Sequence, residues 1–406
     1  MTVKSALPVV ACLWLTCACA DDTDRPSASA GTGVEGLPRL AVLGSDFQTS
    51  TLSFVDLGIP AVEAAGVLHS GSAVGPGGTA LSGDVVLAHS PTPDGRVVLV
   101  DRKSGVLTFV DPAARKVVFQ VSVATGFYAN IQDLAQVSAD KGFVSRMGRN
   151  PTPTPAPGDF DEGDDLLTLD LAARKVAGRL ALASYATLAG TLAAPGRMAI
   201  AGGRVWVPLA SLSANFKTAG TGRVVAVDAV SGAVVRTIDA PDAKNCVTAT
   251  ATPGSEAIAV VCSGFFGDGA VQAKYARLLW LSPDGPAETV VRGDQVGDRP
   301  IQAAAFVDAT RAVLLTAGSF DAGIPDRLWW VDRAKATVQP LGQAAGAFAL
   351  SGLWADVARQ RVYVGERDRK VGDVRVFEIS TAGAVEAASL RMAAGLPGAV
   401  DLAGVP

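Results

Sequence analysis

The sequence predicts an all-β protein, a β-propeller of seven four-stranded blades, because one unit of four short strands recurs along the chain. The clearest copy is the segment 84–123, in which turns rich in Pro, Asp and Gly separate four apolar runs. The runs are 85–87, 96–101, 106–110 and 116–123. Four strands of this length per unit are typical of a propeller blade. Recurrence of such a unit at a period near fifty residues indicates a repeat architecture.

Each copy of the unit is marked by an apolar pair followed by an acidic or polar residue, at the end of its third strand. Successive markers lie 46 to 59 residues apart, and seven markers predict seven blades. We interpret the acids as caps of their own turns, since Asp bonds nearby backbone N–H groups, and not as catalytic groups. The markers are Phe54-Val55-Asp56, Phe109-Val110-Asp111, Thr168-Leu169-Asp170, Ala226-Val227-Asp228, Trp280-Leu281-Ser282, Trp330-Val331-Asp332 and Val376-Phe377-Glu378.

We name the strands of a blade A to D, from the innermost to the outermost. The second to seventh blades are expected at 84–125, 130–183, 194–240, 245–292, 299–343 and 347–391. The first blade has B, C and D runs at 40–43, 52–56 and 62–69, but no A run. A ring must close to remove exposed sheet edges. We therefore expect the C-terminal tail, 395–406, to supply strand A of the first blade.

One segment carries a resemblance to a known family. Residues 223–238, RVVAVDAVSGAVVRTI, resemble the core of YVTN-type propeller repeats, and 105–123 and 166–182 match the same core. The resemblance covers 40–406 and is closer in blades two to four than in five to seven. It implies a seven-bladed, YncE-like propeller of the exported, lipoprotein type. These repeats are structural, so the resemblance carries no catalytic residue over; it implies a surface or binding role.

The composition limits the classes of partner. The chain has 406 residues, of which 49% are hydrophobic and 18% charged, enough for a large core. A net charge of −4 shows no basic excess, which argues against nucleic acid as a partner. The two histidines, His69 and His89, are few for a metalloenzyme. We expect His89, at the end of an inner strand, to be a satisfied channel residue.

The N-terminus predicts export. Residues 1–20 form a secretory signal with Lys4 before a short apolar run, 21–36 form a flexible tether, and 37–406 form the propeller. Cys19 follows a segment that resembles a lipobox, although Thr16 stands where Leu is usual. We favour lipidation of Cys19 and a lipoprotein in the outer membrane, periplasm or cell surface. The alternative is cleavage after Ala20 and a soluble secreted protein.

Two cysteines, Cys246 and Cys262, remain in the mature chain. Two cysteines in an exported chain suggest a disulfide. Cys246 opens strand A of the fifth blade and Cys262 ends strand B, and antiparallel neighbours bring these positions opposite each other. The alternative is a pair of buried thiols.

Insertions between strands B and C indicate a binding face. They lie at 150–163, 210–221, 263–275 and 319–325. B–C and D–A loops emerge on one face, which we call the loop face, and insertions on one face often mark the binding face. Its aromatic and basic residues would suit a protein, peptide or glycan, or the rings could pack down on the blades. The candidates are Phe127, Tyr128, Arg146, Arg149, Phe160, Phe216, Lys217, Phe265, Phe266, Lys274, Tyr275 and Phe320.

The insertion at 151–165, PTPTPAPGDFDEGDD, is the most unusual segment. It offers carboxylate oxygens that Ca²⁺ could use, from Asp159, Asp161, Glu162, Asp164 and Asp165. An EF-hand loop has Gly at its sixth position, whereas Gly163 is fifth from Asp159. We therefore prefer a solvated acidic loop and expect no cofactor, with calcium as the alternative. Arg146 and Arg149 could pair with this loop or bind an anion, and pairing is the simpler interpretation.

Three hypotheses for the function remain. The first is an exported binding or scaffold module with its ligand on the loop face. The second is a hydrolase or lyase with a lactonase-like, channel-centred site; the chain lacks G-x-S-x-G, H-E-x-x-H and Walker motifs, and its acids are assigned to turns, so a non-enzyme is favoured. The third is a structural envelope protein. Three or more ionisable side chains that converge in the channel would favour the enzyme.

Overall fold

The computed structural model describes residues 38–75, 77–154, 156, 158–264, 273–368, 373–381 and 383–405. The described residues all belong to one compact unit of the chain. The predicted signal, tether and lipidated Cys19 lie outside the described residues. Among those described, no helix is both long and apolar enough to cross a membrane.

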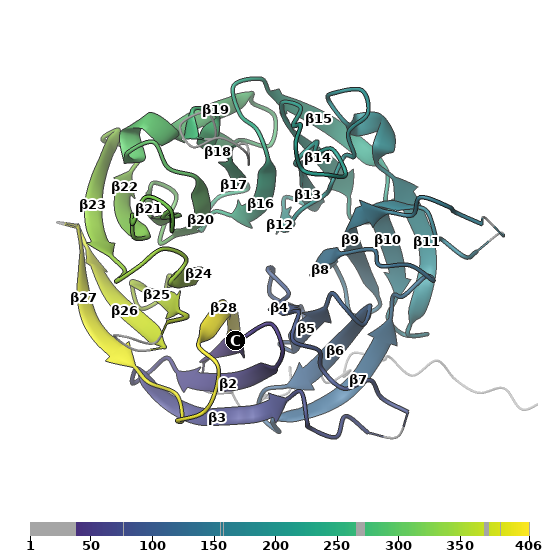
Figure 1. Ribbon diagram of the computed structural model, residues 1–406, viewed down its shortest axis with the longest axis horizontal. Helices are drawn as coiled ribbons and strands as arrows, with labels where there is room; N and C mark the ends of the chain where they lie inside the picture. The colour runs from purple at the N-terminus through teal and green to yellow at the C-terminus, as the bar shows by residue number, and fades with distance from the viewer. Residues whose placement is uncertain are drawn as a thin grey trace, which may run out of the picture. The chain divides into compact units, whose positions relative to one another are not determined.

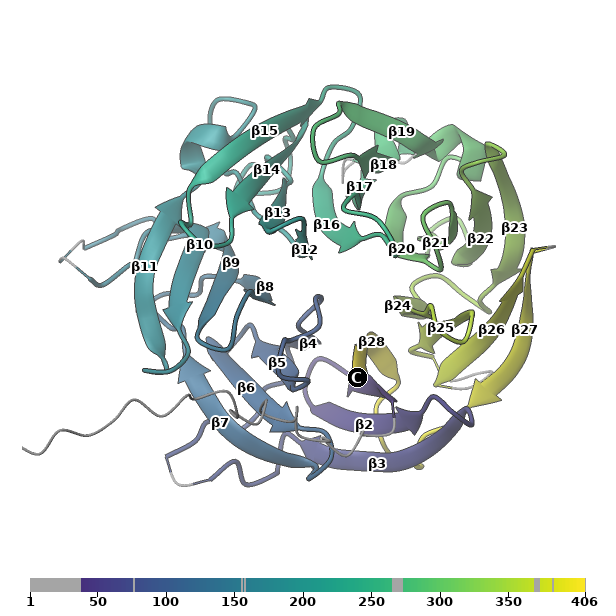
Figure 2. The ribbon, with the colours of Figure 1, turned by 180° about the vertical axis from the view of Figure 1, so that it is seen from behind.

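The described residues form seven antiparallel sheets of four strands, arranged as blades around a ring (Figures 1 and 2). In order A to D, blade 1 is β28 (Ala399–Val405), β1 (Arg39–Ser45), β2 (Ser50–Asp56) and β3 (Ala61–His69). Blade 2 is β4 (Val85–Leu87), β5 (Val97–Asp101), β6 (Val106–Asp111) and β7 (Lys116–Ser122). Blade 3 is β8 (Ile131–Gln136), β9 (Lys141–Arg149), β10 (Gly163–Asp170) and β11 (Lys175–Ala181).

The remaining blades follow the same order. Blade 4 is β12 (Ala199–Ala201), β13 (Arg204–Leu209), β14 (Gly222–Asp228) and β15 (Val234–Ala240). Blade 5 is β16 (Cys246–Ala251), β17 (Ile258–Ser263), β18 (Ala276–Leu281) and β19 (Ala287–Arg292). Blade 6 is β20 (Ile301–Phe306), β21 (Arg311–Thr316), β22 (Arg327–Asp332) and β23 (Thr337–Gln343). Blade 7 is β24 (Leu350–Asp356), β25 (Arg361–Glu366), β26 (Val374–Ser380) and β27 (Gly383–Leu390). The predicted seven-bladed, all-β fold is confirmed.

The C-terminal strand closes the ring, as predicted. β28 pairs antiparallel with β1, from Arg39 opposite Val405 to Gly44 opposite Ala399. Figure 1 shows the yellow β28 inside the purple strands of the first blade. Blade 1 therefore combines strands from both ends of the propeller, and β28 covers the inner edge of β1 that would otherwise be unpaired.

The core lies between blades rather than within one blade. Each of the seven larger clusters of buried apolar side chains is drawn from two neighbouring blades. β5 shows the cause, because Val98 and Val100 pack with blade 3 while Val97 and Leu99 pack with blade 1. Successive side chains of a strand point to opposite faces, and both faces of an inner strand are covered. This explains why the predicted strands are continuous apolar runs.

The turn-capping interpretation of the repeated acids is confirmed at five markers. Asp111 Oδ1, for example, accepts the N–H groups of Ala113 and Ala114 at 2.8 and 2.9 Å. The other four acids that cap their own turns are Asp56, Asp170, Asp228 and Asp332.

The seventh marker is wrong as a strand end. Glu378 lies inside β26 and pairs with Val385, and the strand continues to Ser380. The physical reason is Ile379, which is buried against blade 6 and keeps the strand extended beyond the marker.

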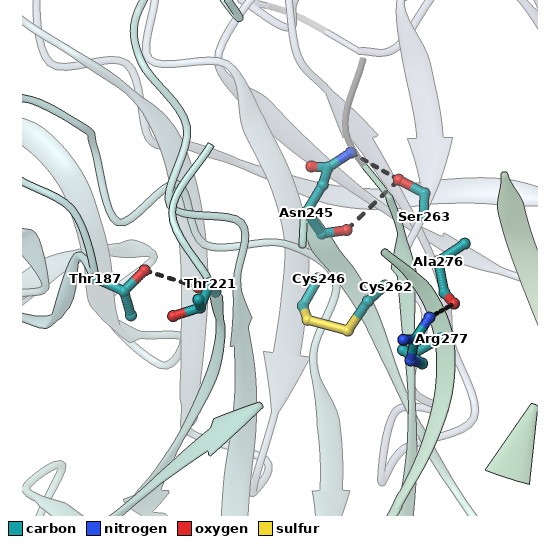
Figure 3. The surroundings of a disulfide bond; sticks show 8 residues. All are labelled: Thr187, Thr221, Asn245, Cys246, Cys262, Ser263, Ala276 and Arg277. Carbon is teal, nitrogen blue, oxygen red and sulfur yellow. Dashed lines mark hydrogen bonds between the residues drawn. A yellow bond between two sulfur atoms is a disulfide. The ribbon is translucent and has the colours of Figure 1, made fainter. Parts of the chain in front are cut away.

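The predicted disulfide joins strands A and B of blade 5. Cys246 and Cys262 are register partners, with an S–S distance of 2.01 Å (Figure 3). Asn245 and Ser263 continue this contact, because the Asn245 Nδ2 donates to Ser263 Oγ at 2.6 Å. The disulfide also packs closely against β14 of blade 4. Only glycine fits at the start of that strand, since a Cβ on Gly222 would lie 2.5 Å from Cys246 Sγ.

Reduction of this disulfide should lower the free energy of unfolding by about 3 kcal/mol, because the bond restricts the unfolded chain over a separation of 16 residues. The measurement is chemical denaturation of the purified protein with and without a reductant. The double variant Cys246→Ser, Cys262→Ser is the control and should not respond to the reductant. Equal stability of the wild type in both conditions would contradict the prediction.

Candidate functional site

Two hollows are candidate sites. The first, which we call the insertion cleft, has a volume of about 600 Å³ and lies between the B–C insertions of blades 3 and 4. Three predicted binding residues meet in it, namely Tyr128, Arg149 and Phe216. Its full lining is Tyr128, Asn130, Met147, Gly148, Arg149, Asn150, Pro151, Pro153, Leu192, Ala194, Leu212, Ser213, Ala214 and Phe216.

Local structure explains how these side chains meet. β9 runs to Arg149 and leads directly into the proline-rich insertion, while Tyr128 comes from the D–A loop before β8. The blade 4 insertion itself contributes to a small apolar cluster separate from the interblade cores, formed by Ala194, Ala210, Leu212 and Ala219. Phe216, at the tip of the blade 4 insertion, has a left-handed φ of 57°, a strained conformation for a bulky residue. Its side chain is 48% exposed.

The two arginines of β9 have different roles. Arg146 is fully buried and forms a bidentate ion pair with Asp165, with both N–O distances at 2.7 Å. It also donates to Thr125 Oγ1 and to the carbonyl of Phe160. Arg149 is exposed, and its guanidinium makes no hydrogen bond or ion pair with the described part of the chain, although its backbone pairs with Gly163 in the sheet. The expected pairing with the acidic insertion therefore applies to Arg146 alone.

Most carboxylates of the acidic insertion already have partners in the propeller. Asp165 also binds Arg179, and Asp164 accepts the N–H groups of Ala193 and Ala194. Burial raises the pKa of Asp164. Asp161 Oδ2 accepts the Thr154 N–H at 2.8 Å. Among the described residues, no group of three or more His, Cys, Asp or Glu side chains is arranged to hold a metal ion.

The other predicted binding residues are spread over the loop face. Phe127 lies against the Arg146 guanidinium, and Phe160 is half-buried against the core between blades 2 and 3. Lys217 is exposed beside Phe216, and Tyr275 contacts the ammonium groups of Lys244 and Lys274. Phe320 is 73% exposed and packs on Phe348. Phe265 and Phe266 lie outside the described residues.

The second hollow, which we call the channel pocket, has a volume of about 360 Å³ and lies among the inner strands. Phe348 and Arg367 in its lining come from loops of the loop face. Six of the seven blades contribute a polar or charged side chain to it: His89, Arg197, Thr248, Gln302, Arg367 and Asp401.

The inner strands share a local irregularity that shapes this pocket. β28, β8, β16, β20 and β24 each contain a shift of register against their B strands near their first residues. Such a bulge re-aims side chains and is common beside functional sites. In β8 and β28 the residue directly after the bulge is an aspartate, Asp133 and Asp401 respectively.

Arg197 lies in the loop before β12 and forms a bidentate ion pair with Asp401 of β28. Its Nη2 donates to Asp401 Oδ2 at 2.8 Å and to the carbonyl of Leu87 at 2.6 Å. Asp401 Oδ2 also accepts the Leu87 N–H at 3.0 Å. Asp401 is buried and the Arg197 side chain is 24% exposed, and an ion pair so largely removed from water needs such additional hydrogen bonds to offset its desolvation. The pair thus links blade 4, blade 2 and the closing strand.

His89 and Asp133 form the adjoining contact. The loop after β4 extends toward the centre of the ring (Figures 1 and 2), and His89 Nε2 lies 2.9 Å from Thr250 Oγ1 of β16. Burial, followed by the charge of Arg197, lowers the pKa of His89 to about 3, so its ring is neutral. Asp133 accepts the N–H groups of His89 and Met198, and burial raises its pKa to about 6.

Sequence reasoning placed His89 in the channel but missed Asp133, Arg197 and Asp401. A signal was available, because Asp133 and Asp401 are the charged residues of inner strands that are otherwise uncharged. An isolated acid at such a position is costly unless it has partners, so each acid implied a polar contact in the channel. The identity of the partner was not readable, since Arg197 is 204 residues from Asp401.

Comparison with known proteins supports the fold alone. No family model matches the chain, and no curated protein matches it. A structure of a hypothetical selenium-binding protein from Sulfolobus tokodaii is similar, with a TM-score of 0.61 at 10% identity over 91% of this chain and 94% of that one.

Two further solved structures cover nearly the whole propeller. A candidate 6-phosphogluconolactonase from Bacteroides fragilis has a TM-score of 0.56 at 10% identity, over 92% of this chain and 99% of that one. Apo AztD from Citrobacter koseri has a TM-score of 0.51 at 11% identity, over 91% and 98%. At such identities the similarity establishes the β-propeller fold and transfers no activity.

Replacement of Asp133 by Asn should make folding more sensitive to acid. The pKa of Asp133 is about 6 in the fold against an ordinary value of 3.8, so proton uptake by this group stabilises the fold as the pH falls through that window. The variant lacks this gain. Between pH 7 and pH 4 its free energy of unfolding should therefore fall by about 2 kcal/mol more than that of the wild type. Urea denaturation at several pH values measures the difference.

His89 provides the control for this prediction, because its protonation affects the stability of the fold with the opposite sign. Its pKa of about 3 in the fold lies below the ordinary 6.5, so the stability it contributes is present above pH 6.5 and is lost as the pH falls. The variant His89→Gln should thus lose less stability than the wild type on acidification. Parallel pH profiles for all three proteins would contradict the assignment.

Proposed function

We propose that this protein is an exported, lipid-anchored β-propeller that binds a ligand at the cell envelope through the insertion cleft of its loop face. The observation that carries the proposal is the convergence of Tyr128, Arg149 and Phe216 in one cleft of about 600 Å³. Exposed aromatic side chains beside a free cation are costly to maintain in solution and are typical of recognition surfaces. Insertions in consecutive repeats on one face favour the same site.

The envelope location rests on features of the sequence and on the disulfide. The signal-like segment 1–20 and the lipobox-like position of Cys19 favour export with an anchor. The Cys246–Cys262 bond is consistent with an oxidising compartment. The resemblance of 223–238 to YVTN-type repeats supports the exported, YncE-like class.

A hydrolase or lyase is the second candidate, and the channel pocket favours it. His89, Arg197 and Asp401 are three ionisable side chains in one pocket, the arrangement expected of a channel-centred enzyme. Against this, both carboxylate oxygens of Asp401 bind Arg197, and His89 bonds Thr250. These contacts hold the inner strands in place, and we therefore rank the binding module first.

Intact mass spectrometry of the protein from its own host should find a lipid-modified N-terminus at Cys19. The physical basis is the short apolar run that ends in this cysteine and precedes a polar tether. The variant Cys19→Ala is the control and should lack the lipid mass. A soluble chain that begins at Asp21 would overturn the anchor and leave secretion as the alternative.

Removal of two aromatic side chains of the insertion cleft should abolish ligand retention. Native mass spectrometry would compare the wild type with Tyr128→Ala, Phe216→Ala after incubation with the low-molecular-mass fraction of the host envelope. The wild type should retain adducts that this variant loses. The matched control is Ile59→Ala, Val230→Ala, because these exposed apolar residues lie in C–D turns on the opposite face.

The outcomes separate the three hypotheses. Equal retention by both double variants would exclude the insertion cleft as the site. An adduct that is lost only in His89→Gln, or is released in altered form, would favour the channel-centred enzyme. Absence of adducts in every protein would overturn the binding proposal and support the structural alternative.

A further inference from the structure

We infer that the insertion cleft takes small organic anions with an apolar body, and that Arg149 receives the anionic group. The inference rests on the proposed function and names the ligand class for its site. It depends on three features of the cleft, namely its apolar walls, the existing hydrogen bonds of its neutral polar groups and its single unpaired guanidinium.

The walls and the floor of the insertion cleft are apolar. Met147 and Leu192 pack against the small cluster around Leu212, which forms the floor. Pro151 and Pro153 of the blade 3 insertion form one wall, and Phe216 stands in the opposite insertion. A volume of about 600 Å³ lies within the range of small-molecule sites, which is roughly 300–1,000 Å³. The apolar body of a small ligand would release water from this surface.

The neutral polar side chains of the lining already have partners. The Asn130 oxygen accepts from Gln132, and its nitrogen donates toward Met147 Sδ. Asn150 donates to Asp161 and accepts the Thr152 N–H.

The hydroxyl group of the lining at Ser213 is also hydrogen-bonded. It donates to Asn215 and accepts the Thr218 N–H. These groups would therefore contribute little to the binding of a ligand.

Arg149 differs from them. Its guanidinium has no hydrogen-bond or ion-pair partner in the described residues, whereas Arg146, three residues earlier in β9, uses Nε, Nη1 and Nη2 in contacts of 2.6–2.7 Å. Arg149 acts electrostatically on Asp164, but the oxygens of Asp164 accept the backbone N–H groups of Ala193 and Ala194 and make no ion pair with the guanidinium. Five N–H donors in a planar fork match a carboxylate, sulfonate or phosphate.

The charge of the lining itself agrees with an anionic ligand, while the carboxylates of Asp84 and Asp161 outside it are bonded to Tyr128 and Asn150. The lining contains no Asp or Glu, although the whole chain carries a net charge of −4. An exposed guanidinium–carboxylate contact alone is weak, so the apolar body must supply the rest of the affinity.

The test uses 2-naphthoate as the anionic probe and 2-naphthamide as its neutral counterpart of nearly the same shape. Isothermal titration of the full-length protein should show 2-naphthoate binding about ten-fold more tightly than 2-naphthamide, the value of one charge-assisted contact. In Arg149→Gln the two affinities should become equal, while Arg149→Lys should keep part of the preference. Phe216→Ala should weaken both probes.

A matched variant controls for net charge. Arg292→Gln removes one exposed arginine that lies at the end of β19, outside the cleft lining, and should leave the preference for 2-naphthoate unchanged. Loss of the preference in this variant would indicate a general charge effect and overturn the role of Arg149.

Two other results would overturn the inference and bear differently on the proposed function. Equal binding of both probes by the wild type, weakened by Phe216→Ala, would refute the anion and leave the cleft as a binding site. Failure of both probes to bind would refute this ligand class. The adduct comparison with envelope extract would then decide the proposed function independently.

Discussion

The pairing of β28 with β1 is the constraint on which the rest of the fold depends. Every interblade core needs two blades as walls, and the clusters on both sides of blade 1 include side chains of β28 itself, such as Leu402 and Val405. Without β28 the first blade would expose an inner edge, and its two neighbours would each lose part of one wall. Asp401 strengthens this point, because the same strand carries the carboxylate that binds Arg197 in blade 4.

The molecule separates its rigid parts from its variable parts. The turns on one face are fixed by acids such as Asp111 and Asp228, which cap their own backbones. The channel is fixed by the contacts of His89, Asp133 and Arg197. The loop face carries the B–C insertions, and there one arginine of β9 anchors the insertion while the guanidinium of the other remains free. Binding specificity can therefore change in the insertions at little cost to the ring.

Features that depend on local pattern or strand order were predictable from the sequence. The runs of blade 2, the closing strand and the Cys246–Cys262 bond follow from apolar periodicity and from the antiparallel order of a blade. The loop face was also predictable, because it needs only connectivity. The cleft was not, since its shape depends on how two insertions lean together. Phe160 illustrates the limit. It lies in the blade 3 insertion, yet its ring packs against the core between blades 2 and 3, which its position in the sequence does not reveal.

The order in which the chain is made gives the closing strand a further consequence. Among the described strands β28 is the last to leave the ribosome, while its partner β1 is the first. The blade that contains both cannot be assembled until nearly all of the propeller has been synthesised, so folding intermediates carry an unsealed first blade with apolar walls. Such species are prone to aggregate and are natural clients of chaperones. A premature stop codon even a few residues before Val405 would therefore damage the oldest part of the chain as well as the newest.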